Sequence, residues 1–88
     1  GIQESTNILL DGIKTYSNTN AGIYSNMSSD VSINNVQSTI DNQGIVLSDN
    51  RNLNLYNIVI SEPSTYGIND TTLTAAIISN YSNVAIYN

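Results

Sequence analysis

The chain has 88 residues and a formal net charge of −5, and its only cations are Lys14 and Arg51. It contains fifteen Asn, twelve Ser and eight Thr beside thirteen Ile, and it lacks Cys, His, Phe and Trp. This composition excludes a disulfide framework and a thiolate metal site, and it leaves no basic surface for nucleic acid or an anionic membrane. A hydrophobic fraction of 40% with a charged fraction of 10% also argues against a disordered chain.

A Gly-Ile pair recurs along the first half of the chain, at residues 1–2, 22–23 and 44–45. A second motif recurs with nearly the same spacing. It is a polar residue followed by two apolar residues separated by one position, and it occupies residues 7–10, 30–33, 52–55 and 83–86. Self-similarity at a fixed period of about 20–50 residues is typical of solenoids, in which each repeat packs only against its neighbours.

A turn is predicted at the same point of every repeat. Four positions beyond the first apolar residue of the second motif stand residue types that tolerate a positive φ, namely Gly12, Asn35, Asn57 and Asn88. An apolar residue follows at once in three of the four copies. Each period therefore reads as three short segments with period-two alternation, as expected of strands that bury one face.

A fixed period places like residues above one another, which favours a solenoid over a sandwich. We predict an all-β fold, a right-handed parallel β-helix of about four coils of 21–23 residues. Whether the segments wind within one chain or come from three intertwined chains stays open. The expected internal columns are Ile2, Ile23, Ile45 and Ile77; Ile8, Val31, Leu53 and Val84; and Leu10, Ile33, Leu55 and Ile86.

Two registers compete for the last coil. The pair Gly67-Ile68 continues the Gly-Ile spacing at 23 residues. However, the segment that starts with Ala76-Ile77 matches residues 22–35 almost position for position, with one residue deleted. We favour the second register, which makes residues 63–75 an insertion that leaves the coil at Pro63.

The Gly-Ile pair with the polar-apolar-x-apolar-x-Asn-apolar signature resembles the coils of the pectate-lyase-like parallel β-helix superfamily. This group includes polysaccharide lyases and hydrolases, alginate epimerase-like surface proteins, and bacteriophage tailspikes and appendages. The resemblance implies that Asn35, Asn57 and Asn88 form a structural ladder of stacked amides, which ends at Gly12 in the first coil. We expect residues 1–88 to be one β-helix segment of a larger protein.

No catalytic constellation is evident among the carboxylates. A glycosidase needs two carboxyl groups on either side of one sugar bond, about 5–10 Å apart. The nearest approaches to a cluster are Asp41 with Glu62, and Asp30 beside Asn52, and neither recurs with a cation. We expect the acids to be solvated turn residues. We assign no catalytic residue, no metal ligand and no cofactor, and whether the parent protein is an enzyme stays open.

Two of the six tyrosines are candidate carbohydrate-binding residues. Tyr24 follows the inward Ile23 and Tyr56 follows the inward Leu55, so both rings are expected to point outward. Outward aromatic rings set among amides and hydroxyls suit stacking against sugar rings. The alternative is that these tyrosines cover a strand edge or form a subunit contact.

The resemblance implies a structural and binding module of a phage tailspike or similar surface appendage. Such a module would contact cell-surface polysaccharide, form a homo-oligomer, expected to be a trimer, and sit on a virion or outside the cell. Alternatives are part of a polysaccharide lyase or hydrolase with its catalytic residues mainly outside this segment, or a bacterial or archaeal adhesin. We expect no nucleic-acid partner and no membrane insertion, because no apolar run approaches bilayer length.

Overall fold

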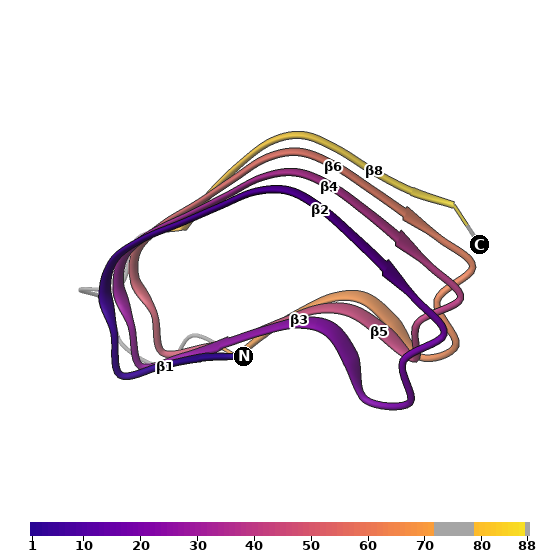
Figure 1. Cartoon of the computed structure of the whole chain (residues 1–88), viewed down its shortest axis with the longest axis horizontal. Helices are drawn as coiled ribbons and strands as arrows, with labels where there is room; N and C mark the ends of the chain where they lie inside the picture. Colours follow the sequence, from indigo (N-terminus) through magenta and orange to yellow (C-terminus); the bar gives the residue numbers. More distant parts are fainter. Residues whose placement is uncertain (72–78, 88) are drawn as a thin grey trace.

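The computed structural model is an all-β, all-parallel solenoid (Figure 1), and it describes residues 1–71 and 79–87. No helix that could cross a membrane is found in these two ranges. The strands in chain order are β1 (Ile2–Gln3), β2 (Thr6–Tyr16), β3 (Ala21–Asn26), β4 (Ser29–Thr39), β5 (Gln43–Ser48), β6 (Arg51–Ser61), β7 (Tyr66–Thr71) and β8 (Ser79–Tyr87).

Successive strands alternate between two parallel sheets. The first sheet has the order β1-β3-β5-β7, and the second has the order β2-β4-β6-β8. In Figure 1 the first sheet forms the lower wall and the second forms the longer, bent upper wall. The predicted parallel β-helix is confirmed, and its coils wind within one chain. It makes about three turns rather than four.

The first sheet identifies the register of the last coil. Ile23 pairs with Ile45, and Ile45 pairs with Ile68. The Gly67-Ile68 register is therefore correct, and the preference for Ala76-Ile77 is wrong; Ala76 and Ile77 themselves lie outside the described residues. At the other end Ile2 pairs with Ser25, so the first Gly-Ile pair is displaced by two positions from the column predicted for it.

The extra length of the last coil lies after β7, so residues 63–71 are not part of an insertion as predicted. Ile45 and its partner Ile68 are 23 residues apart, whereas Leu53 and its partner Ser79 are 26 apart. Three additional residues therefore fall between the end of β7 and the start of β8. Pro63 lies in the ordinary turn between β6 and β7.

The last strand joins the core five residues further along the coil than predicted. The observed pairs are Leu55 with Tyr81, Ile58 with Val84, and Ile60 with Ile86. The reason is that the third coil holds two Asn-apolar-x-apolar units, at residues 52–55 and 57–60, and residues 83–86 repeat the second of them. The columns predicted for Val84 and Ile86 are therefore wrong, although both residues stack on aliphatic neighbours.

Aliphatic side chains from the middle coils fill the interior. Those with no more than 1% of their surface exposed are Val31, Ile33, Val36, Ile45, Leu47, Leu53, Leu55, Ile58 and Ile60. Full burial of one such side chain contributes about 1.5–3 kcal/mol. One coil alone could not bury them, because each column needs a neighbour above and below. The stacked strands thus supply most of the apolar contact that stabilises the fold.

Four residues with positive φ recur at constant offsets in each of the first three coils. They are Glu4, Asn7, Gly12 and Ser17; Met27, Asp30, Asn35 and Ile40; and Asp49, Asn52, Asn57 and Glu62. The left-handed turn predicted at Gly12, Asn35 and Asn57 is confirmed. The other three corners of each coil were not predicted, and several of them are occupied by Met, Ile or Glu, which rarely adopt this conformation. Stacking on the neighbouring coil imposes the backbone there despite the local preference.

The two ends of the core differ in polarity. At the N-terminal end an open hollow of about 300 Å³ is lined mainly by apolar residues, among them Ile2, Leu10 and Ile23. In the last coil Tyr81 and Asp70 take the positions that Leu55 and Leu47 hold one coil earlier. The Tyr81 hydroxyl donates to the Asp70 carboxylate, and burial together with this carboxylate raises the pKa of Tyr81. A polar bridge therefore joins the two sheets at the C-terminal end.

Candidate functional site

A shallow groove on the outer face of the first sheet contains Tyr24. Its volume is about 450 Å³, and it is lined by Gly1, Asn20, Ala21, Tyr24, Gln43 and Val46. Tyr24 and Val46 are register partners on β3 and β5, and both side chains are half-buried. Figure 1 shows that the turn before β3, at lower right, projects beyond the turns of the later coils. The groove thus combines an apolar floor with the side-chain amides of Asn20 and Gln43.

The Gln43 side chain is fixed in orientation by the next coil. Asn69 on β7 donates from its Nδ2 to Gln43 Oε1 at 2.9 Å. Because this bond engages the carbonyl oxygen of Gln43, its two amide N–H donors are the groups available to a bound molecule. The backbone N–H of Gln43 also donates to the carbonyl oxygen of Asn20 at 3.1 Å, which ties together the two polar residues of the groove.

Asp41 holds the turn that borders this groove. Its carboxylate accepts hydrogen bonds from Thr15 Oγ1 and Ser38 Oγ, both at 2.5 Å, and from the backbone N and Nδ2 of Asn18, both at 2.8 Å. The side chain is only 1% exposed. Burial by itself would raise the pKa of Asp41, but the hydrogen bonds from Ser38, Thr15 and Asn18 outweigh it and hold the pKa below its ordinary value.

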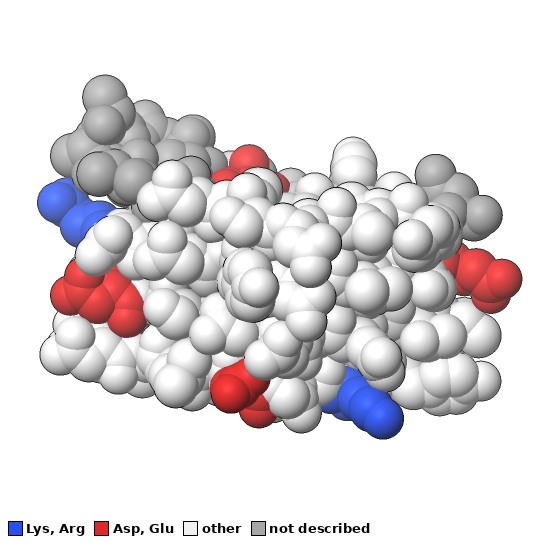
Figure 2. All heavy atoms as spheres, turned by 90° about the horizontal axis from the view of Figure 1, so that it is seen from above, with Lys and Arg blue, Asp and Glu red and all other residues white. Residues whose placement is uncertain are grey.

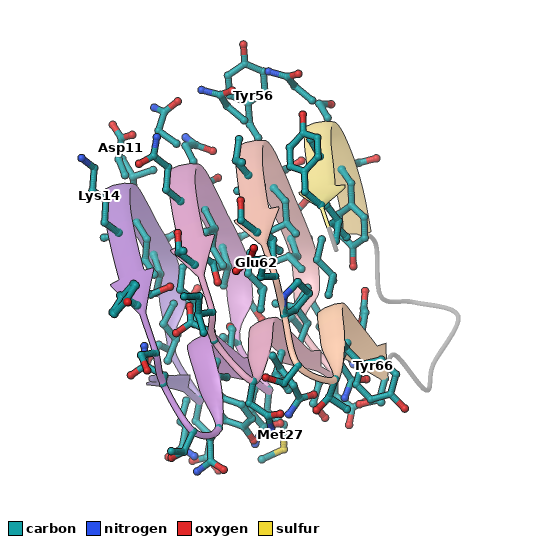
Figure 3. All side chains as sticks on the ribbon, turned by 90° about the vertical axis from the view of Figure 1, so that its right-hand side faces the viewer. Asp11, Lys14, Met27, Tyr56, Glu62 and Tyr66 are labelled. Carbon is teal, nitrogen blue, oxygen red and sulfur yellow. The ribbon has the colours of Figure 1, made fainter. Side chains whose placement is uncertain are left out.

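The prediction that the acids are solvated turn residues is wrong for Asp41. A signal was present in the sequence, because Thr15 and Ser38 are register partners in a column that continues with Ile60. Two hydroxyls at an inward position need a polar partner, and Asp41 supplies it. Glu62, by contrast, is exposed (Figure 3). Since the Asp41 carboxylate is enclosed by donors, the two acids do not form a carboxylate pair around a substrate.

Stacked side-chain amides follow the bend of the second sheet. Asn57 Nδ2 donates to Asn35 Oδ1 at 2.7 Å, and Asn83 Nδ2 donates to Asn57 Oδ1 at 2.8 Å. The rung after Asn57 is thus Asn83, whereas Asn88 lies outside the described residues. In the first coil, where Gly12 has no side-chain amide, Asn35 Nδ2 donates instead to the carboxylate oxygen Oδ1 of Asp11 at 2.7 Å. A parallel bond at 2.6 Å joins Asn52 Nδ2 to Asp30 Oδ1 at the neighbouring corner.

Replacing Asn57 by Asp tests how much the ladder contributes to stability. The variant loses the donor to Asn35 and sets a carboxylate against its Oδ1, so we expect the free energy of unfolding to fall by about 1–2 kcal/mol. Gln37→Glu makes the same charge change on the same wall, outside the ladder and beside Lys14 and Val59 in register. Its free energy of unfolding should change by less than about 0.5 kcal/mol. Urea denaturation followed by circular dichroism measures both. Equal losses in the two variants would show that charge, rather than amide stacking, causes the effect.

Tyr56 lies on a different wall from Tyr24. It is 53% exposed on the outer face of the second sheet, next to Asn34 and Ser82 in register (Figure 3). Tyr24 belongs to the first sheet, so the structure does not bring the two candidate tyrosines together. Alternation along a strand separates inward from outward positions, but it cannot tell whether two outward residues share a surface.

The outer wall of the second sheet is largely uncharged. Figure 2 looks onto this wall from above and shows the charged side chains confined to its margins. A hollow of about 280 Å³ on this sheet is lined by Gly12, Ile13, Lys14, Asn35, Val36, Gln37, Asn57 and Val59. Figure 3 places Lys14 near Asp11 at the first-coil edge of this sheet. This hollow therefore has a cation in its lining but no aromatic ring.

Neither the ligand chemistry of the side chains nor comparison with known proteins assigns an activity. Within residues 1–71 and 79–87, no three Asp, Glu, His or Cys side chains gather in a way that could hold a metal ion. No protein-family model matches the chain, and no curated protein matches it. Function is therefore inferred from the shape and chemistry of the outer walls, and the Tyr24 groove has the largest volume of the three hollows described above.

Proposed function

We propose that the chain is a carbohydrate-binding β-helix segment and that the Tyr24 groove is its sugar-binding site. The observation that carries the proposal is an outward tyrosine set in a groove between two side-chain amides. The Tyr24 ring and Val46 offer an apolar platform for the C–H face of a pyranose, while Asn20 and Gln43 can bond its hydroxyl groups. The groove volume of about 450 Å³ falls in the range of small-ligand sites, roughly 300–1,000 Å³.

The biological setting that we propose is a larger protein on a virion or outside the cell, such as a phage tailspike or a similar appendage that meets cell-surface polysaccharide. The support is the solenoid architecture itself, together with walls rich in amides and hydroxyls and poor in charge (Figure 2). Fold alone hosts many functions, so this setting depends on the groove binding sugar. Assembly as a homo-oligomer, with a trimer as the expected form, belongs to the same proposal.

Replacing Tyr24 by Ala tests the proposed site. Loss of the ring removes the stacking platform, so affinity for a bound neutral polysaccharide should fall about tenfold, which corresponds to about 1.4 kcal/mol. Affinity electrophoresis in gels containing a panel of neutral glucans, mannans and galactans measures the change.

Tyr56→Ala is the matched control, since it removes the same residue type from the other wall. We expect it to leave the retardation of the chain unchanged. If Tyr56→Ala abolished retardation and Tyr24→Ala did not, the site would lie on the second sheet and the proposed groove would be wrong.

A further inference from the structure

We infer that the Tyr24 groove selects neutral glycans over glycans that carry carboxylate or sulfate groups, and that Gln43 is a second residue that contacts the sugar. The inference rests on the proposed function of the groove as a sugar site. It adds the chemical class of the ligand and names a second contact residue, neither of which follows from the outward position of Tyr24.

The distribution of charge supports this selection. The side chains that line the groove are all uncharged. The two cationic side chains lie elsewhere: Lys14 lines the hollow on the second sheet, and Arg51 begins β6. An acidic sugar in the groove would leave water without gaining a cationic side chain as partner, and it would meet a chain of net charge −5. Hydroxyl groups carry no such penalty.

The fixed amide of Gln43 supplies the matching donor. Asn69 Nδ2 engages Gln43 Oε1 at 2.9 Å, so the carbonyl oxygen is turned to the next coil and the N–H groups remain for the ligand. A sugar hydroxyl oxygen can accept from Gln43 Nε2 while the ring lies on Tyr24. Because the orientation is set before binding, the donor needs little additional ordering when the sugar arrives.

Binding measurements with neutral polysaccharides and their C6-oxidised counterparts test the selection of neutral sugars separately from sugar binding itself. The pairs are glucan with glucuronan and mannan with mannuronan, in which ring and linkage are kept and the C6 hydroxymethyl group is replaced by a carboxylate. The chain is used with an acetylated amino terminus, so that the α-amino charge of Gly1 plays no part. We expect the chain to bind at least one neutral member and to bind its oxidised partner at least tenfold more weakly in calorimetric titration at moderate salt.

Gln43→Glu tests the donor with little change of shape. Asn69 can still donate to the new carboxylate, but the N–H donors are gone, so affinity for the neutral glycan should fall about tenfold. Asn26→Asp, on the same sheet but outside the groove lining, makes the same charge change and should bind as the parent chain does.

The outcomes are distinct. Equal or tighter binding of an oxidised glycan would overturn the selection of neutral sugars, and full affinity in Gln43→Glu would overturn the contact with Gln43. Either result leaves the sugar site in place. Failure of every member of both series to bind would overturn the proposed function itself.

Discussion

Replacing Asp41 by Ala is expected to lower the free energy of unfolding by about 3–5 kcal/mol. The substitution leaves the hydroxyls of Thr15 and Ser38 and the N–H groups of Asn18 without their common acceptor. Each buried polar group that loses its partner costs about 1–3 kcal/mol, and the losses are partly shared within one network. Guanidinium denaturation followed by circular dichroism measures the change.

Asn at position 41 separates the role of charge from the role of shape. Asp41→Asn keeps one acceptor oxygen for Asn18, and the two hydroxyls can rotate to accept from the new amide, so we expect a loss of only about 1–2 kcal/mol. If Asp41→Ala lowered the free energy of unfolding by no more than Asp41→Asn does, the carboxylate of Asp41 would not be what organises the turn.

The parent chain and Asp41→Asn should also differ in how their free energy of unfolding changes in acid. The pKa of Asp41 is lower in the folded state than in an unfolded chain, so its stabilisation is fully present above the unfolded pKa of about 4. It is lost as the pH falls further, through the folded pKa. The parent chain should therefore lose stability below about pH 4 more steeply than Asp41→Asn does. Parallel pH profiles of the two chains would show that Asp41 is not the group responsible.

Much of the fold could be predicted from the repeat, because a solenoid uses the same physical solution in each coil. Gly-Ile at residues 22–23 and 44–45 and the Asn corners at Asn35 and Asn57 sufficed to place Ile23 over Ile45 and Val31 over Leu53. The last coil could not be placed in this way. Its extra residues disturb the period, and the third coil contains two Asn-apolar-x-apolar units, at residues 52–55 and 57–60, so that residues 83–86 fit either position.

Less of the candidate site could be predicted. Alternation placed Tyr24 on an outer wall, but a groove requires neighbours from three coils. The bond from Asn69 to Gln43 and the enclosure of Asp41 join residues 23 to 26 positions apart that the repeat does not make alike. A repeat describes what the coils share, whereas a site arises where one coil differs from the next. The hydroxyl pair of Thr15 and Ser38 in an otherwise aliphatic column was the one local sign of such a difference.

Replacing Gly44 by Ala should lower the free energy of unfolding by about 2–3 kcal/mol, and it tests why Gly precedes Ile in the repeat. A Cβ at Gly44 would lie 2.6 Å from the carbonyl oxygen of Gly67 and 2.7 Å from Cδ1 of Ile60. The backbone oxygen cannot move without disturbing the pairing of β5 with β7, and the Ile60 side chain is fully buried. Overpacking of a core by one carbon atom costs about 1–3 kcal/mol, and the fixed backbone places this site at the upper end.

Gly12→Ala is the control, because Gly12 is a glycine at which close packing does not exclude a side chain. Gly12 has a positive φ of 75°, but a Cβ built on it meets no atom within 4 Å. We therefore expect Gly12→Ala to lose only about 1 kcal/mol, from backbone strain alone. If its loss matched or exceeded that of Gly44→Ala, close packing between coils would not explain the Gly of the Gly-Ile pairs. A larger loss in Gly44→Ala than in Gly12→Ala would instead show that Gly44 is required by close packing against Gly67 and Ile60. Gly12 would then be required only by the backbone conformation of the corner at which the second sheet bends.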